Sequence, residues 1–325
     1  MHDQPEPPMS GFEKTAIIGA GTMGHGLALV HALAGCSVRL HDNDEGTLAR
    51  SVQLVETAAA TLVEAGEIGE TVARDACARI DRSADLQTVI PGSNLVIEAI
   101  IEDAEAKRAL FAEIDGLADD TAVIASNTSY LDPFPLIPKS RQRRSLVTHW
   151  YTPPYIIDLV DLAPGPETDR ALMERMRDFH VGMGKRPMLF DRLIQGYVAN
   201  RLQSALTLEI VRLLDEGLAT PELIDGSIRH GLAQRMALQG QLAKVDHAGL
   251  DMMRRALANR VYTPPEVKGH CRVLDELMAE GRRGVMSGGG FYDYSEGGPE
   301  LLRRRDLKLL ALRRAIGEIE REYEP

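Results

Sequence analysis

The chain has 325 residues, 44% of them hydrophobic and 26% charged, which is typical of a soluble globular protein long enough for two domains. A formal net charge of -11 and a pI of about 5.4 indicate a surface that repels nucleic acid and anionic membranes, so we expect neither as a partner. The three cysteines are odd in number and lack CxxC spacing, which argues against a disulfide framework or a structural zinc site and favours a reducing compartment.

Residues 1–11, MHDQPEPPMSG, are acidic and Pro-rich. They have neither the basic start nor the apolar stretch of a signal peptide, so we expect a disordered tail on a cytoplasmic protein. No run in the chain approaches the roughly 18 apolar residues of a membrane span.

From residue 13 to about residue 191, short β-branched runs alternate with helical patterns, which is typical of βαβ units and a mostly parallel sheet. The expected strands are 15–19, 37–42, 94–100, 121–126, 145–149, 156–162 and 186–190. Apolar residues at helical spacing predict helices over 48–66 and 105–118.

Helical patterns dominate after Gly196. The expected helices lie within 197–217, 221–233, 248–260, 271–281 and 301–323. Strand-like alternation is nearly absent after residue 191, so we place a domain boundary near Arg192. The predicted fold class is α/β: a Rossmann-type dinucleotide-binding domain over 12–191, followed by an all-helical domain over 192–325. The amphipathic helices would suffice for a dimer interface, although such stripes more often face a core.

A GxGxxG pattern lies directly after the first expected strand and opens a helix. Its residues are Gly19, Ala20, Gly21, Thr22, Met23 and Gly24. The first glycine permits a tight turn, the second lets a pyrophosphate approach the backbone, and the third lets helix and strand pack closely. A Gly-rich turn is sometimes only a turn, but Asp42 ends the next strand, 18 residues past the last glycine, where an acid binds the ribose of NAD. Asp42 would repel a 2′-phosphate, which favours NAD over NADP.

The segment 146–162, LVTHWYTPPYIIDLVDL, places His149 at the end of an expected strand and Asp161 twelve residues later. A histidine suits the base that takes a hydroxyl proton while a hydride leaves the carbinol carbon. A carboxylate on its other ring nitrogen would fix the tautomer, and Ser129 and Asn200 could hydrogen-bond the developing carbonyl. From the residues alone, a polar loop, a helix cap and a buried structural asparagine remain open.

Several motifs occur in the order found in the 3-hydroxyacyl-CoA dehydrogenase family, which the chain resembles over nearly its whole length. They are GAGTMGHGLA (19–28), VIEAIIEDAEAK (96–107), ASNTS (125–129), the His149 segment, QGYVANRLQ (195–203) and GGGFYDY (288–294). The resemblance implies NAD-linked oxidation of a 3-hydroxyl group to a ketone. It also implies a Rossmann-type domain, a helical domain that forms a homodimer, and a site between the two.

The resemblance further assigns roles to individual residues. It implies catalytic roles for His149, Asp161, Ser129 and Asn200, and contacts to the cofactor for Glu102, Lys107 and Ser129. No metal site is implied. Lys107 has an alternative role as an ordinary i, i+4 partner of Asp103 on an acidic helix face.

Two departures from the family pattern lie around the histidine. Asp161 stands where the family has a glutamate, one methylene longer, so it reaches His149 only with a small backbone shift. The family's HFFNP is HWYTP here, so Thr152 replaces an asparagine near the nicotinamide.

Two further departures concern the substrate and the cofactor. Residues 51–70, on the helical stretch where CoA lies in acyl-CoA members, contain four glutamates and no Lys or Arg. A gapless match puts Ala58 and Ala65 where such members carry a serine and a lysine. A CoA phosphate would therefore find no cationic partner there. Met286 stands where a cofactor-side lysine is usual.

The stretch 153–168, PPYIIDLVDLAPGPET, resembles the branch of the family that acts on free small acids, including gulonate, carnitine and pyridine-carboxylate dehydrogenases. We therefore expect a small free hydroxy acid, or a related alcohol or aldehyde, as substrate, slightly ahead of a short acyl thioester such as 3-hydroxybutyryl-CoA. Candidates for a carboxylate clamp are Arg201, Arg229 and Arg235, although surface ion pairing is the more common role of any single one.

Two other functions compete with this prediction. The β-hydroxyacid dehydrogenases related to 6-phosphogluconate dehydrogenase use a lysine on the first long helix of the second domain, but no lysine lies between Lys185 and Lys244. A non-catalytic NAD-binding or crystallin-like structural protein is the alternative of another class. The presence of His149, Ser129 and Asn200 weighs against it.

Overall fold

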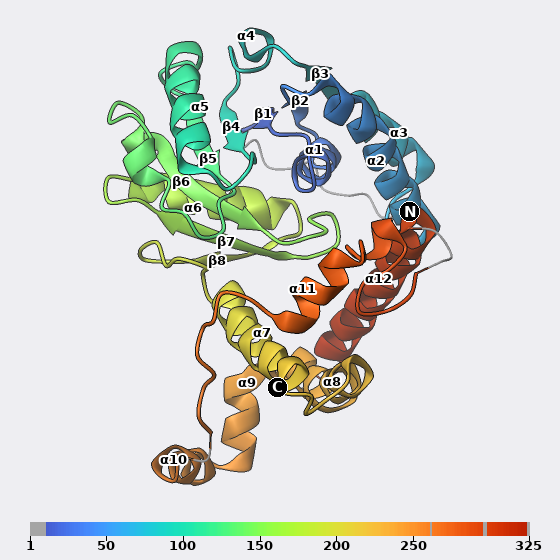
Figure 1. Cartoon of the computed structure of the whole chain (residues 1–325). Helices are drawn as coiled ribbons and strands as arrows, with labels where there is room; N and C mark the ends of the chain where they lie inside the picture. The colour runs from blue at the N-terminus through green and yellow to red at the C-terminus, as the bar shows by residue number, and fades with distance from the viewer. Residues whose placement is uncertain (1–10, 261, 295–297, 324–325) are drawn as a thin grey trace. The chain divides into compact units, whose positions relative to one another are not determined.

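The computed structural model describes residues 11–260, 262–294 and 298–323. The predicted N-terminal tail therefore lies outside the described residues, apart from Gly11. The chain divides into two compact units, of which the first ends at Val198 and the second begins at Ala199 (Figure 1). The boundary predicted near Arg192 falls a few residues earlier and stays a prediction.

The first unit is built on one eight-stranded sheet with the order β3-β2-β1-β4-β5-β6-β7-β8. Its strands are β1 (Lys14–Ile18), β2 (Ser37–His41), β3 (Ile80–Ser83), β4 (Leu95–Glu98), β5 (Val123–Ser126), β6 (Ser145–Trp150), β7 (Leu159–Pro164) and β8 (Arg186–Leu189). Neighbouring strands run parallel except β6 and β7, which are antiparallel. This arrangement confirms the predicted mostly parallel α/β sheet.

Strand β3 has no counterpart among the predicted strands. Its sequence, IDRS, is short and mostly polar, and only Ile80 is buried. It pairs with β2 alone at the edge of the sheet, so its place depends on main-chain hydrogen bonds rather than on an apolar pattern.

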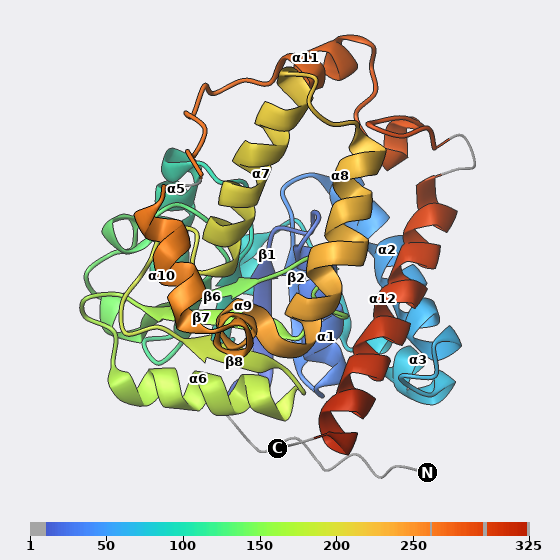
Figure 2. The same cartoon turned by 90° about the horizontal axis from the view of Figure 1, so that it is seen from below.

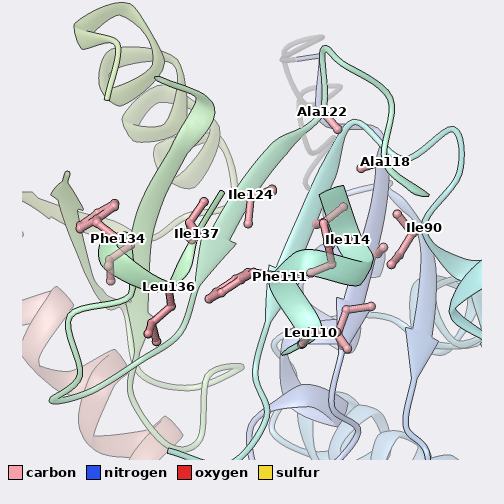
Figure 3. Close-up of a cluster of buried hydrophobic side chains, with 14 of the residues drawn as sticks. Ile90, Leu110, Phe111, Ile114, Ala118, Ala122, Ile124, Phe134, Leu136 and Ile137 are labelled. Atoms are coloured by element: carbon pink, nitrogen blue, oxygen red, sulfur yellow. The ribbon is translucent and has the colours of Figure 1, made fainter. Parts of the chain in front are cut away.

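Helices connect and cover these strands. They are α1 (Gly24–Leu33), α2 (Glu45–Glu64), α3 (Glu70–Ala78), α4 (Leu86–Val89), α5 (Ala104–Leu117) and α6 (Arg170–Gly182), with 3-10 turns at Phe134–Leu136 and Gln142–Arg144. Helix α5 lays Phe111 and Ile114 into a cluster with Ile124 of β5 (Figure 3). Helix α6 packs against β7 and β8, along the other end of the sheet (Figure 2). Helices α1 and α6 pack directly on strands, whereas α2 packs against α1 and α3.

The described part of the second unit is helical, as predicted. Its helices are α7 (Ala199–Asp215), α8 (Pro221–Ser227), α9 (Gln234–Ala248), α10 (Leu250–Ala258), α11 (Arg272–Ala279) and α12 (Gly298–Glu322), with a π-helical segment at Ile228–Ala233 and a 3-10 turn at Val285–Ser287. Extended pairing in this unit is limited to isolated bridges around Gly289. Among the described residues of the whole chain, no helix is both long and apolar enough to cross a membrane.

Candidate active site

The glycines of the loop between β1 and α1 have different surroundings. A Cβ atom on Gly24 would lie 1.6 Å from the carbonyl oxygen of Gly19, and one on Gly19 would lie 2.5 Å from the carbonyl oxygen of Ala99. Gly19 also has a φ of +105°, which favours glycine. A Cβ on Gly21 would meet no atom within 4 Å. Two glycines therefore serve packing within the chain, whereas Gly21 faces open space where a phosphate could approach.

Asp42 lies directly after β2 and is tied to this loop. Its Oδ2 accepts a hydrogen bond from the Ala20 N–H at 2.9 Å, and its Oδ1 accepts one from the Asp44 N–H at 3.0 Å. Because β1 and β2 are parallel neighbours, their carboxyl ends bring the glycine loop and the acid to one edge of the sheet. The acid predicted to bind the ribose thus stands beside the predicted phosphate loop.

A cavity of about 1350 Å³ lies at this edge. Its walls include Gly19, Gly21, Thr22, Met23, Asp42, Glu102, Asn127 and Ser129. Apolar side chains, among them Ile100 and Leu110, line another part of it. A wide cavity with a glycine loop, an acid at the end of the second strand and an apolar wall fits a dinucleotide.

Glu102 holds the loop that carries Ser129. Its Oε1 accepts hydrogen bonds from the Thr128 hydroxyl and from the N–H groups of Ser129, Tyr130 and Leu131, at 2.7 to 3.1 Å. Burial alone would raise the pKa of Glu102, but these hydrogen bonds and Lys107 outweigh it and lower the pKa to about 2. The carboxylate is therefore ionised at neutral pH and fixes the loop after β5.

Lys107 lies beneath this carboxylate and is only 1% exposed. Its Nζ donates to Glu98 Oε1 at 2.5 Å and lies 3.3 Å from Glu102 Oε2. The Asp103 side chain instead caps α5 by accepting from the Ala106 N–H. Lys107 is not among the residues that line the cavity. Its predicted contact with the nicotinamide ribose stays a prediction, and its observed contacts are with the two glutamates.

The sheet register brings His149 and Asp161 together. They are directly opposite each other on the antiparallel strands β6 and β7. His149 Nδ1 lies 3.4 Å from Asp161 Oδ2, and both residues are buried. This distance exceeds the usual 2.7 to 3.2 Å of an N–H···O bond. The pairing arises from cross-strand register rather than from the twelve-residue spacing.

The other ring nitrogen of His149 faces Ser129. Its Nε2 lies 3.2 Å from the Ser129 hydroxyl oxygen, and Ser129 also lines the cavity. The serine is held from below by Glu102 and follows β5, the parallel neighbour of β6. Three predicted residues, Ser129, His149 and Asp161, thus form one connected chain of side chains.

Two tyrosines beside His149 were absent from the predicted site. Tyr197 stacks on the imidazole, with ring centroids 4.5 Å apart, and its hydroxyl donates to the Thr128 carbonyl at 2.8 Å. Tyr151 meets the imidazole edge-on at 4.6 Å. Tyr197 lies within the QGYVANRLQ motif and has a φ of 45°, rare for a residue with a side chain. The motif was the available signal for Tyr197, whereas nothing in the sequence pointed to a contact of Tyr151.

The remaining predicted residues have other surroundings. Asn200 lies in the first turn of α7, in the second unit, so its catalytic role stays a prediction. The Thr152 hydroxyl lies 3.0 Å from the sulfur of Met23, at the glycine loop. Ala58 is 3% exposed and belongs to the core under α2. The interpretation of Ala58 as a lost CoA contact stays a prediction. No group of three or more metal-ligating side chains occurs within the described ranges.

Comparison with known protein families identifies two matching domains. Residues 14–192 match the NAD binding domain of 3-hydroxyacyl-CoA dehydrogenase, and residues 196–294 match its C-terminal domain. The chain belongs to the 3-hydroxyacyl-CoA dehydrogenase family. It is an NAD-dependent oxidoreductase of this family, which confirms the predicted cofactor and reaction class.

Family members with different activities are similar to the chain. A 5-formyl-3-hydroxy-2-methylpyridine 4-carboxylate 5-dehydrogenase from Mesorhizobium japonicum is 30% identical, covering 93% of this chain and 97% of the relative. The mitochondrial hydroxyacyl-coenzyme A dehydrogenase of Sus scrofa is 30% identical, covering 86% and 90%. The crystal structure of a 5-formyl-3-hydroxy-2-methylpyridine 4-carboxylic acid 5-dehydrogenase, described as an NAD⁺-dependent dismutase, superposes on this chain with a TM-score of 0.81 at 27% identity. The superposition covers 94% of this chain and 99% of the dehydrogenase.

Proposed function

We propose that this enzyme oxidises the secondary hydroxyl of a small free hydroxy acid, with His149 as general base. The observation that carries the proposal is the series of side-chain contacts from Ser129 to His149 and from His149 to Asp161, which begins at the wall of the cofactor cavity. An aspartate at Nδ1 favours the tautomer that carries its proton there, which leaves the Nε2 lone pair facing Ser129.

The chemistry requires the removal of one proton and one hydride from the substrate carbinol. Bound NAD supplies the hydride acceptor. His149 Nε2 takes the hydroxyl proton as the carbonyl forms, and Asp161 stabilises the resulting imidazolium. The Ser129 hydroxyl donates a hydrogen bond to the substrate oxygen and so orients it toward the imidazole. We propose the same orienting role for Asn200, and cofactor contacts for Glu102 and Lys107.

A free acid is favoured over a CoA thioester by the charge of α2 and the loop after it. Residues 51–70 carry Glu56, Glu64, Glu67 and Glu70, and three of these are exposed. A CoA phosphate on this surface would meet like charge instead of the Lys or Arg that binds phosphate well. The similarity to a pyridine-carboxylate dehydrogenase over nearly the full length of both chains supports the same choice.

A short-chain 3-hydroxyacyl-CoA is the second candidate substrate, supported by similarity to the pig hydroxyacyl-coenzyme A dehydrogenase. The two candidates are separated by one assay of NADH absorbance with 3-hydroxybutyrate, gulonate, carnitine and 3-hydroxybutyryl-CoA. We expect a free acid to give the highest kcat/KM. Preferential use of the thioester would refute the charge argument, and absence of turnover with a wider panel of alcohols would favour the crystallin-like role.

The role of His149 is tested by His149→Ala. We expect kcat to fall by at least about a thousandfold, because removal of a general base held by a carboxylate typically lowers the rate on this scale. The NAD dissociation constant should stay within about twofold, because His149 is not among the residues lining the cofactor cavity. Full activity of the variant would contradict the proposed mechanism.

We also propose a cytoplasmic homodimer formed through a helical domain that begins near Arg192. The three cysteines are unpaired, which suits a reducing compartment. Helices α9 and α10 expose several large apolar side chains, including Leu242 at 76% exposure and Leu257. Such a surface is expected of an interface. Light scattering should give twice the chain mass, and a monomer at micromolar concentration would contradict the proposal.

A further inference from the structure

Tyr151 contacts the carboxylate of the proposed dyad more closely than the histidine does. Its hydroxyl donates to Asp161 Oδ2 at 2.6 Å. The same oxygen lies 3.4 Å from His149 Nδ1. Tyr151 directly follows β6, so the segment that positions His149 also positions this hydroxyl. One oxygen of Asp161 thus lies between the phenol and the imidazole.

A carboxylate in this position needs a strong donor. Asp161 is 2% exposed, and a buried carboxylate is costly unless hydrogen bonds replace its water. The contact with His149 is too long to serve alone, whereas 2.6 Å is typical of a charge-assisted O–H···O⁻ bond. The phenol also keeps its proton, because burial and the adjacent Asp161 both raise the pKa of Tyr151.

We propose that Tyr151 is a positioning residue that holds the Asp161 carboxylate against His149. This proposal rests on the proposed function. The hydroxyl compensates for the missing methylene: the short acid cannot reach far across the β6–β7 pair, and the phenol fixes its oxygen at the imidazole edge. A longer carboxylate at position 161 would not need this donor.

The other groups around His149 do not take this role. The Tyr197 hydroxyl is engaged by the Thr128 carbonyl, although its ring stacks on the imidazole. Ser129 faces the opposite ring nitrogen. Glu102 is occupied by the backbone of the loop after β5. Of the two tyrosines that contact the His149 ring within the described residues, Tyr151 donates its hydroxyl to Asp161, whereas Tyr197 donates to the Thr128 carbonyl.

The experiment is a double-mutant cycle on the full-length enzyme, with the panel compound of highest kcat/KM as substrate and saturating NAD. Tyr151→Phe should lower kcat about tenfold while changing the NAD dissociation constant less than about twofold, since it weakens the base and not the cofactor site. Asp161→Glu should also lower kcat, by about fivefold, because the longer side chain crowds the phenol. The double variant, Tyr151→Phe with Asp161→Glu, should return to within about threefold of the native kcat.

Tyr262→Phe is the matched control, because it removes another tyrosine hydroxyl that donates to a carboxylate, Glu209 Oε2 at 2.8 Å, on an exposed surface of the second unit. Its kcat should be unchanged. A native kcat in Tyr151→Phe would overturn the proposal, as would failure of the double variant to recover. If Tyr151→Phe does not fold, Asp161→Glu decides alone, because native kcat in that variant would show that the tyrosine and the short acid are not matched.

The outcomes separate this proposal from the proposed function. If His149→Ala abolishes turnover but Tyr151→Phe leaves it unchanged, only the role of Tyr151 is wrong. If His149→Ala retains activity, the general-base mechanism is wrong, whatever Tyr151→Phe does.

Discussion

Acidification to pH 5 should destabilise this protein strongly through two buried histidines behind the active-site strand. His31 of α1 and His180 of α6 are each about 1% exposed or less and lie against Trp150, the residue after His149. Burial lowers the pKa of His31 to about 4 and that of His180 to about 3. The Nε2 atom of His31 has no hydrogen-bond partner within the described residues, so a proton added there would find no acceptor.

The magnitude follows from linkage. The folded pKa values lie below the unfolded value of 6.5, so the unfolded chain binds more protons between pH 6.5 and pH 4. The stabilisation is complete above pH 6.5 and is lost as the pH falls. Each histidine should cost about 2 kcal/mol by pH 5, or about 4 kcal/mol for the pair. That is a large fraction of the roughly 5 to 15 kcal/mol by which native proteins are stable.

Urea unfolding between pH 7.5 and pH 5 measures this loss. The double variant His31→Leu/His180→Leu is the control: its free energy of unfolding should fall by about 4 kcal/mol less over the same range, whatever its stability at pH 7.5. His25 and His41, whose pKa values are also lowered by burial, titrate equally in both proteins and cancel in the comparison. Equal pH dependence in the two proteins would refute the reasoning.

Two further predictions concern the cofactor site. Gly21→Ala should leave the melting temperature unchanged but raise the NAD dissociation constant at least about tenfold, because its Cβ meets no protein atom. Gly24→Ala should destabilise the fold by about 3 kcal/mol or more, because its Cβ meets a backbone atom. Thermal unfolding and NAD titration separate the two effects, and equal effects of the two variants would contradict the different roles of the two glycines. Asp42→Asn keeps an acceptor for the Ala20 N–H but removes the charge. The preference for NAD over NADP, measured as a ratio of kcat/KM values, should therefore fall about tenfold. An unchanged ratio would show that this charge does not discriminate between NAD and NADP.

The glycine loop and Asp42 were predictable because their spacing reflects local geometry. A tight turn after a strand, and an acid at the end of the next parallel strand, are separated by one helix of nearly fixed length. The helices α2 and α5 were predictable for a similar reason, since their apolar residues recur at 3.6-residue spacing. Strand β3 was missed because a short polar edge strand has no such pattern.

The contacts of the proposed catalytic residues were harder to predict from the sequence. His149 and Asp161 were named from a family resemblance, but the 3.4 Å separation follows from their register on β6 and β7. No sequence pattern indicated that the Ala58 side chain is buried, or that Lys107 lies between two carboxylates.

The class of fold, the cofactor and the family could be predicted from the amino-acid sequence, because each depends on patterns that are local or ordered along the chain. The tertiary structure was needed to show that Tyr151 and His149 approach the same oxygen of Asp161. Tyr151 and Asp161 are ten residues apart along the chain, and their hydrogen bond exists because β7 returns antiparallel to β6. Side-chain contacts across strands depend on register and rotamer, which no short-range pattern encodes.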